Sequence, residues 1–409
     1  MEKQKSIQSK NNNNNSSKKP ILQIIVNKIL SCPNQTINKA SGFIESLISK
    51  NIKNLKIFSE DGLPDEIPIL RSIIWKINFG YLPINNEEWT KILEDKRSSY
   101  FYYKDIFTKK LQEEFKLYKD YNTISKEDKE KIDKKTNKSL LEQIRKDVNR
   151  THNQMDFFFK SIDENNKLTK KELMEMMENR INCSMKNIND IYKINIKETH
   201  ADVIVRILFI YSYFFPDLSY VQGMNEIIAP IYYIFSFDKT YGVEPSIENI
   251  EADTFWTFNC LMTQVKDIFN REKDDKDIGL SGKVKRLKLM LKIVDSQLYE
   301  HFEKYKLEYS TFAYRWFILF FSQEFLMIDI LRLWDYIFAP EDKFLNCYFI
   351  SLAVLFLKKD ELLVSDLTGM LSELRSIKGL NVEEMISISK KIKSEYGQEC
   401  FKIINEIYE

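Results

Sequence analysis

Glycine and proline are scarce in this chain, and their scarcity limits the folds that it can adopt. The 409 residues include only ten glycines and nine prolines. A β-sandwich or β-barrel needs a turn roughly every eight to twelve residues and relies on these residue types for many of those turns. Apolar residues instead recur three and four positions apart, as in Ile204, Leu208, Tyr211 and Phe215, which is the spacing of one helix face. The sequence therefore predicts an all-α fold.

The charge balance and the cysteines exclude several function classes. Sixty-one Lys and Arg residues stand against sixty Asp and Glu residues, a net charge of +1. Nucleic-acid binders normally carry a surplus of positive charge, so we expect no nucleic-acid partner. The five cysteines are widely spaced and form no C-x-x-C pair, which is typical of reduced thiols in a cytoplasmic protein.

The chain shows no segment that would target it to or across a membrane. Residues 1–20 are rich in Lys, Ser and Asn and lack the apolar stretch of a signal peptide. The longest apolar runs, 316–321 and 348–357, are shorter than the 18 or so residues of a membrane span. We expect a soluble protein.

Composition also divides the chain. Residues 1–20 are predicted to be disordered because they cannot bury enough apolar area. Residues 21–58 form an N-terminal helical extension, with helical spacing at 21–30 and 41–57. The break at 62–64 starts the main domain, residues 59–360, and residues 361–409 add C-terminal helices that complete it. The stretch 382–408 reads as one or two amphipathic helices that either pack on the domain or bind a partner.

Two stretches within the main domain depart from the compact pattern and look like insertions, near 96–138 and 160–198. The first contains the mixed charge run 125–135, which is typical of a solvated helix face or a mobile loop. The second contains a predicted helix-capping box at Thr169 and Glu172.

Two short segments carry side chains that can act on a phosphate. They read IRKDVNRT at 144–151 and YVQGMN at 220–225. A guanidinium from one protein can neutralise charge on a phosphoryl group that another protein transfers, and a glutamine amide can orient the attacking water. If the segments converge, Arg150 and Gln222 are suited to complete the active site of a GTPase.

Each segment also has a plain structural interpretation. An arginine that ends a helical segment is more often a surface ion-pair partner, and Asp147 lies three residues earlier on the same face. In the functional interpretation, Asp147 holds the Arg150 guanidinium in place, so that less side-chain entropy is lost on docking. Gln222 and Asn225 could instead cap a helix after a turn at Gly223. The residues alone leave both interpretations open.

The order of the segments resembles the TBC-domain family of Rab GTPase-activating proteins. The family pattern is I-x-x-D-x-x-R-T followed by Y-x-Q-G-M-N. Further segments resemble family elements: GLP at 62–64 with LRSIIWK at 70–76, FAYRW at 312–316 and RLWD at 332–335. The resemblance spans roughly residues 55 to 360 and implies one large domain with two helical subdomains.

The resemblance also assigns roles. It implies that Arg150 and Gln222 are two catalytic fingers and that Asn225 helps to hold the finger loops. The residues expected to support the fingers are Asp147, Thr151, Tyr220, Gly223, Met224, Asn225, Arg71 and Trp75.

Ordinary packing accounts for many of these residues. Large groups near the loops are expected to fill the core, namely Tyr220, Met224, Trp75 and Trp334. Charged residues within apolar helices are expected to form buried ion pairs or hydrogen bonds, namely Arg71, Arg315 and Asp335. Thr151 is expected to bond the backbone at the end of its helix.

One segment departs from the family pattern. After Arg150 and Thr151 the family usually has a short loop that contains proline, whereas this chain reads HNQMDFFF at 152–159. The missing proline makes the path of the loop uncertain, and Phe157 to Phe159 are expected to anchor it.

No cofactor motif is present. The sequence has no Walker phosphate loop, no dinucleotide glycine fingerprint and no zinc-ligand spacing. A calcium loop starting at Asp163 is rejected because Lys167, Leu168 and Met174 stand where the ion needs an oxygen ligand, a glycine and a glutamate. We therefore expect no metal or cofactor of its own, with GTP and Mg²⁺ carried by the partner.

These observations predict an activator of a Rab-family small GTPase, without substrate turnover of its own. Its partner would be the GTP-bound GTPase, and its contact with endomembranes in vesicle trafficking would be indirect, through the lipid anchor of that partner. One alternative is a catalytically silent Rab-binding scaffold or effector of the same fold. Another is an unrelated helical module, in which Arg150 and Gln222 lie far apart. Substrate choice depends on rim contacts, so the sequence does not identify the Rab.

Overall fold

The computed structural model describes residues 21–118, 138–162, 198–237, 246–270 and 278–405. Within these ranges every regular element is a helix, apart from one isolated β-bridge between Ser161 and Thr199. The predicted all-α fold is confirmed. Three other predictions lie outside the described residues: the disordered segment 1–20, the charge run 125–135 and the capping box at 169–172.

The N-terminal helices cover one side of the molecule. They are α2 (Ile21–Leu30), α3 (Asn34–Ile48), α4 (Ile52–Asp61) and α5 (Pro68–Asn78). The helix predicted at 21–30 is confirmed, whereas the stretch predicted at 41–57 is two helices. It is divided because the Asn51 side chain accepts a hydrogen bond from the backbone N–H of Asn54 at 3.1 Å and so caps α4.

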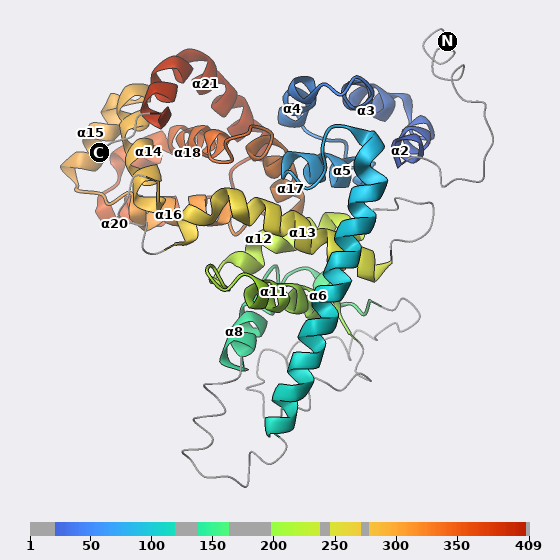
Figure 1. Ribbon diagram of the computed structural model, residues 1–409. Coiled ribbons are helices and arrows are strands. Elements are labelled where there is room, and N and C mark those ends of the chain that lie inside the picture. The colour runs from blue at the N-terminus through green and yellow to red at the C-terminus, as the bar shows by residue number, and fades with distance from the viewer. Residues whose placement is uncertain (1–20, 119–137, 163–197, 238–245, 271–277, 406–409) are drawn as a thin grey trace.

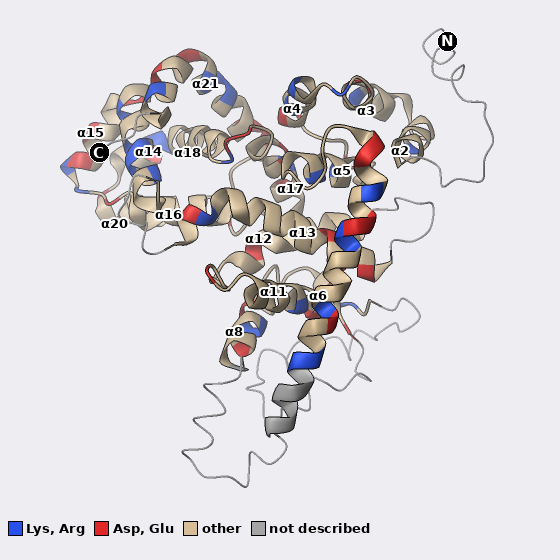
Figure 2. Ribbon diagram, viewed as in Figure 1, with Lys and Arg blue, Asp and Glu red and all other residues tan. Residues whose placement is uncertain are grey.

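A long helix, α6 (Trp89–Tyr118), runs along the edge of the molecule (Figure 1). It follows the short 3-10 turn η1 (Asn86–Glu88) and packs on α11 and α13. The first part of the insertion predicted near 96–138 lies within this helix, and its being an insertion stays a prediction. Tyr100 and Phe107 are buried, because α6 turns an aromatic face toward the core while its charged face meets water. In Figure 2 both signs of charge alternate along α6.

The middle of the chain forms the centre of the molecule. Its elements are α8 (Lys138–Val148), η2 (Asp156–Phe159), α11 (His200–Phe214), α12 (Met224–Ser236), α13 (Ile247–Val265) and η3 (Lys266–Phe269). Helix α12 contacts α5, α8, α11 and α13 and is buried along most of its length. It therefore gives a rigid base to the loop that precedes it.

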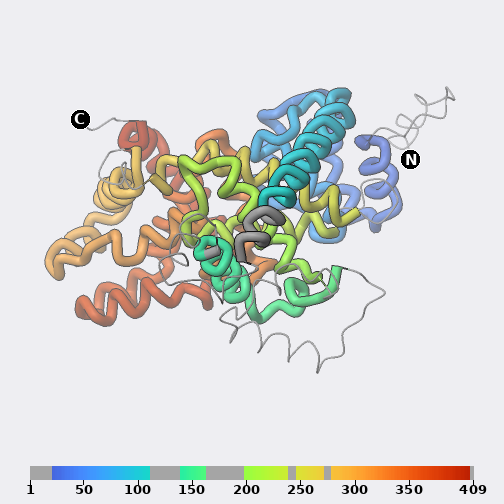
Figure 3. Tube along the Cα trace, turned by 60° about the horizontal axis from the view of Figure 1, so that its bottom comes forward, coloured from blue at the N-terminus to red at the C-terminus, as the bar shows by residue number. Residues whose placement is uncertain are grey.

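The C-terminal helices form the other side of the molecule, as a view turned by 60° shows (Figure 3). They are α14 (Leu280–Val294), α15 (Ser296–Lys304), α16 (Ser310–Leu319), α17 (Met327–Ile337), α18 (Leu345–Leu357), α19 (Lys359–Val364), α20 (Leu367–Arg375) and α21 (Val382–Asn405). The amphipathic stretch predicted at 382–408 is one helix over its described part, and it packs on α14, α17 and α18. Within the described ranges no helix is both long and apolar enough to span a membrane.

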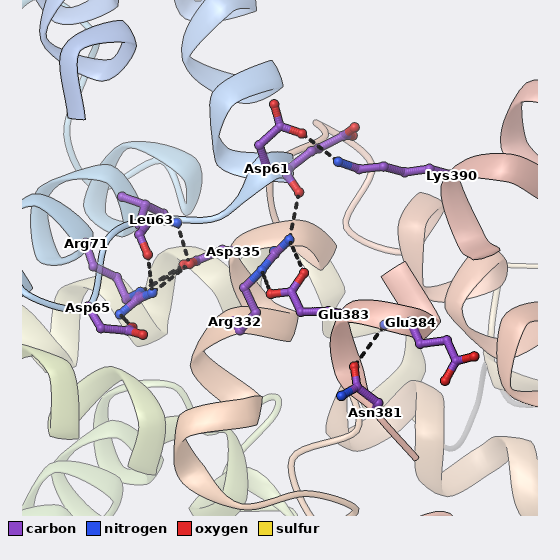
Figure 4. A network of polar contacts seen from close by, with 11 residues as sticks. Asp61, Leu63, Asp65, Arg71, Arg332, Asp335, Asn381, Glu383, Glu384 and Lys390 are labelled. Atoms are coloured by element: carbon purple, nitrogen blue, oxygen red, sulfur yellow. Dashed lines mark hydrogen bonds and ion pairs between the residues drawn. The ribbon is translucent and has the colours of Figure 1, made fainter. Parts of the chain in front are cut away.

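A buried polar junction joins the two sides (Figure 4). The carboxylate of Asp335 in α17 accepts hydrogen bonds from Arg71 Nη2 at 2.9 Å, Trp75 Nε1 at 2.8 Å and the backbone N–H of Leu63 at 3.0 Å. Near it Lys390 of α21 pairs with Asp61 at 2.6 Å. The prediction that Arg71 and Asp335 form buried ion pairs or hydrogen bonds is confirmed, and they form them with each other.

Candidate functional site

The structure brings the two predicted segments into direct contact. Helix α8 carries Asp147 near its end, and Tyr220 lies in the loop before α12. The Tyr220 hydroxyl is 2.8 Å from the Asp147 carboxylate, although the two residues are 73 positions apart in the chain. Burial and the neighbouring Asp147 raise the pKa of Tyr220, so its hydroxyl stays protonated and can donate. This contact contradicts the alternative in which the two segments lie far apart.

Both candidate fingers are exposed. Arg150 lies just after α8, where its backbone N–H bonds the carbonyl of Asp147 at 3.0 Å. Neither the guanidinium of Arg150 nor the amide of Gln222 has a hydrogen-bond or ion-pair partner among the described residues. The predicted pair between Asp147 and Arg150 is therefore absent, because Asp147 bonds Tyr220 instead. Both headgroups are available to a partner.

Asn225 ties the two segments together. Its side chain is buried, and Nδ2 donates to Thr151 Oγ1 at 2.7 Å. Its Oδ1 accepts from the backbone N–H of Gly223 at 3.1 Å, within the loop that carries Gln222. Thr151 Oγ1 in turn donates to the carbonyl of Asp147 at 3.1 Å, as predicted. The Asn225 amide therefore links Thr151, which follows Arg150, to Gly223, which follows Gln222.

The loop geometry requires a glycine beside Gln222. Gly223 has φ +104°, a left-handed conformation that side chains disfavour. A Cβ there would lie 2.8 Å from Cδ2 of Leu319 in α16. The predicted turn is therefore present, and it packs closely against a side chain of α16. Met224 is fully buried and anchors the loop to the core, and its sulfur lies 3.3 Å from the backbone nitrogen of Val221.

A buried carboxyl group lies behind both loops. Glu226 is 5% exposed and accepts from Asn225 Nδ2 at 3.2 Å. Burial raises the pKa of Glu226 to about 7, and hydrogen bonds from Gln323 and Thr151 partly oppose this rise. The sequence analysis missed Glu226 and Gln323. A usable signal was present, because Glu226 is the one charged residue in the apolar run of α12.

His152 occupies the place where the family pattern has its proline-containing loop. Burial lowers the pKa of His152 to about 4, and its Nε2 lies 3.8 Å from Glu226 Oε2. Its φ of +43° turns the chain toward η2, where Phe158 and Phe159 are buried and Phe157 stacks on His200 at 4.3 Å. The predicted phenylalanine anchor is confirmed, so the loop is fixed without the proline.

Two residues predicted to support the fingers lie elsewhere. The side chains of Arg71 and Trp75 bond Asp335 in the junction between α5 and α17. They do not meet the loops at Arg150 or Gln222 in the part of the chain that the structure describes. Any effect of Arg71 or Trp75 on the fingers passes through the packing of α5 on α12. No group of three or more potential metal-ligating side chains is gathered among the described residues.

Fold and site together define an all-α protein that presents an arginine and a glutamine from two hydrogen-bonded loops. The family model of the Rab-GTPase-TBC domain matches residues 157–363, a range that includes Gln222 and begins just after Arg150. The chain is 30% identical over 383 residues to TBC1 domain family member 13 of Homo sapiens, covering 84% of this chain and 93% of that protein. The chain belongs to the Rab-GTPase-TBC domain family.

A yeast protein is similar to the chain in part of its sequence and in fold. GTPase-activating protein GYP1 of Saccharomyces cerevisiae is 26% identical over 337 residues, which cover 78% of this chain and 42% of that protein. The crystal structure of the Ypt/Rab-GAP domain of Gyp1p is similar in fold, with a TM-score of 0.62 at 21% identity, covering 90% of this chain and all of that one.

Proposed function

We propose that this protein accelerates GTP hydrolysis on a GTP-bound Rab-family GTPase by supplying Arg150 and Gln222 in trans. Family membership supports the Rab GTPase-activating function. The observation that carries the mechanism is the pair of exposed, unpaired headgroups on loops that Asn225 and Tyr220 hold together.

Arg150 acts on charge. Its guanidinium reaches the partner's phosphates and neutralises the charge that develops as the terminal phosphoryl group is transferred. An arginine supplied in this way accelerates hydrolysis by roughly 10³ to 10⁵, or about 4–7 kcal/mol of barrier. Because Arg150 has no partner of its own to leave among the described residues, no ion pair there must break on docking.

Gln222 acts on position. Its amide orients the attacking water against the phosphorus, taking the part of a glutamine that the GTPase itself carries. Gly223 and Met224 hold the loop from which Gln222 projects, so little entropy is lost when the amide engages. The buried residues behind the loops are positioning residues, since they act through Arg150 and Gln222.

The remaining chemistry belongs to the partner. GTP and Mg²⁺ are bound by the GTPase, and this chain supplies one arginine and one glutamine in trans. The protein then works in the cytoplasm and on endomembranes in vesicle trafficking, where its lipid-anchored partner is located.

The test is single-turnover GTP hydrolysis across a panel of GTP-loaded Rabs. Wild-type protein accelerates phosphate release from at least one Rab, and Arg150→Ala and Gln222→Ala lose that acceleration. Matched controls are Arg375→Ala and Gln297→Ala, which remove the same exposed groups from α20 and α15. GTP-dependent binding by wild type without phosphate release would establish a silent scaffold or effector instead.

A further inference from the structure

A third loop meets the same cluster. The segment 320–328 comprises the loop between α16 and α17 and the first two residues of α17, and both helices contact α12. Its Gln323 side chain hydrogen bonds the buried carboxyl of Glu226. Just before it, Leu319 packs against the position where a side chain at Gly223 would point. The segment is therefore in contact with the base of both finger loops.

Backbone strain marks the same three loops. Six non-glycine residues of the described chain have positive φ, and four of them lie here: His152, Ser219, Phe320 and Phe321. The two phenylalanines are consecutive, with φ of +47° and +63°, and both are buried. Strain of this kind costs about 1–3 kcal/mol per residue and persists where the surroundings over-determine it, which is typical of functional sites.

The third loop is held firmly but presents apolar side chains to water. Phe325 and Met327 are buried, and the buried Glu324 pairs with Arg315. Between them Leu326 is 60% exposed and Ile328 is 57% exposed. Two large aliphatic side chains are therefore exposed beside the candidate site, one at the end of the strained loop and one in the first turn of α17, and such side chains can bind a partner.

We propose that Leu326 and Ile328 form a docking surface for the GTP-bound GTPase. This inference rests on the proposed function and extends it, because it assigns part of the binding energy to residues that take no part in the chemistry. An average protein interface covers about 800 Å² on each partner, a patch about 30 Å across. A partner that covers Arg150 and Gln222 therefore also reaches this segment, whose Gln323 bonds Glu226 behind the two loops.

Charge favours the GTPase over a lipid surface. The first turn of α17 carries the acidic Asp329 directly after Ile328, and segment 320–328 itself has no lysine or arginine. Binding to anionic lipid depends on clustered cations, each worth about 1 kcal/mol near the surface. An apolar protein surface next to the nucleotide is the better match for this loop.

The experiment separates docking from chemistry by steady-state kinetics on a responsive Rab. Leu326→Glu and Ile328→Glu are expected to raise the KM for the GTP-loaded GTPase by roughly tenfold or more, with kcat within about twofold of wild type. Val364→Glu is the matched control, since Val364 is 87% exposed on α19. The neutral pair Leu326→Asn and Ile328→Asn separates loss of apolar contact from added charge, and thermal unfolding verifies that each variant is folded.

Each other outcome has one meaning. If wild type activates a Rab but the variants behave like Val364→Glu, the docking surface is wrong and the proposed function stands. If wild type activates no Rab, the proposed function itself fails. An unchanged KM together with altered sedimentation mass, or altered binding to phosphatidylserine vesicles, would overturn the inference in favour of self-association or a lipid surface.

Discussion

The buried acids of α12 and α13 differ in the partners that surround them. Helix α13 carries Glu251 and Asp253, and each is met by two basic side chains. Helix α12 carries Glu226 behind the finger loops, where its hydrogen-bond partners are neutral. Burial alone would raise the pKa of Asp253, but Lys76 and Arg97 lower it below its ordinary value. Burial raises the pKa of Glu226 to about 7.

The difference separates a structural role from a positioning role. Glu251 and Asp253 of α13 form ion pairs with α5, α6 and α11, so they fix the angles at which these helices cross. A change in their protonation state has no use in that role. Glu226 instead bonds the neutral side chains of Gln323, Thr151 and Asn225, which belong to or hold the loops around it. The exposed Arg150 and Gln222 differ from both groups of acids, because neither headgroup has a partner among the described residues. The predictions below test this division.

The largest effect is expected from Arg150→Ala. Removing the exposed guanidinium should lower the rate of stimulated hydrolysis by roughly 10³ or more while leaving the unfolding midpoint unchanged. Gln222→Ala should lower the same rate with equally little effect on stability. Single-turnover phosphate release and thermal unfolding measure the two properties. A loss of stability that parallels the loss of activity would contradict the assignment of these residues to the partner's chemistry.

The second-largest effect, on the free energy of unfolding, is expected in α13, whose buried acids form ion pairs. Asp253→Asn leaves Lys76 buried with no carboxylate, and breaking a buried pair in this way costs about 3–5 kcal/mol. Urea unfolding should show that loss. Exposed Asp105, which pairs with Lys109 within α6, is the matched control, and Asp105→Asn should change the unfolding free energy by less than about 1 kcal/mol. Equal effects would mean that burial does not distinguish the two pairs.

The helices could be predicted from the sequence more readily than the contacts between loops. Residues 204–215 and 330–337 repeat apolar side chains at helical spacing, so α11 and α17 followed directly. The pairing of Asp147 was wrong because its predicted partner was the nearest one along the helix, whereas Tyr220 comes from a distant segment. The i−3 rule describes only local neighbours.

The candidate site could be predicted where its residues lie within the two motifs, including the buried Thr151 and Asn225, but not where they lie outside them. Arg150 and Gln222 belong to motifs that a family resemblance can assign. Glu226 and Gln323 meet only after α12 and α16 have packed, and no local spacing encodes that contact. Arg71 and Trp75 show the converse, because a family motif placed them near the fingers while their bonds go to Asp335.

Stability should depend on pH through Glu226. Its pKa is about 7 when folded and 4.5 when exposed, so between these values the folded protein keeps a proton that the unfolded chain has released. The stability from the protonated carboxyl is complete below pH 4.5 and is lost as pH rises through 7, a change of about 3 kcal/mol. Glu226→Gln should remove this pH-dependent loss of stability, so the variant should unfold at a higher urea concentration than wild type at pH 8.

Urea unfolding at several pH values measures the effect. His152 gives the opposite slope, because its folded pKa of about 4 lies below 6.5 and its contribution is lost as pH falls. Glu226→Gln should therefore flatten only the limb between pH 4.5 and 7. An unchanged pH profile in that variant would show that the carboxyl is not the titrating group, and that the contrast with α13 is not one of protonation.

The smallest effect is expected from Gly223→Ala. The substitution forces a side chain into a left-handed backbone and within 2.8 Å of Leu319, which should cost about 1–3 kcal/mol of stability. It should also raise the barrier to stimulated hydrolysis, because a side chain disfavours φ of +104° and the turn that carries Gln222 must adjust. Gly379→Ala is the matched control, since nothing lies within 4 Å of the added methyl group there. If Gly223→Ala lost stability but kept full activity, the position of Gln222 would not depend on this turn, and rigidity of the loop would be a property of the fold alone.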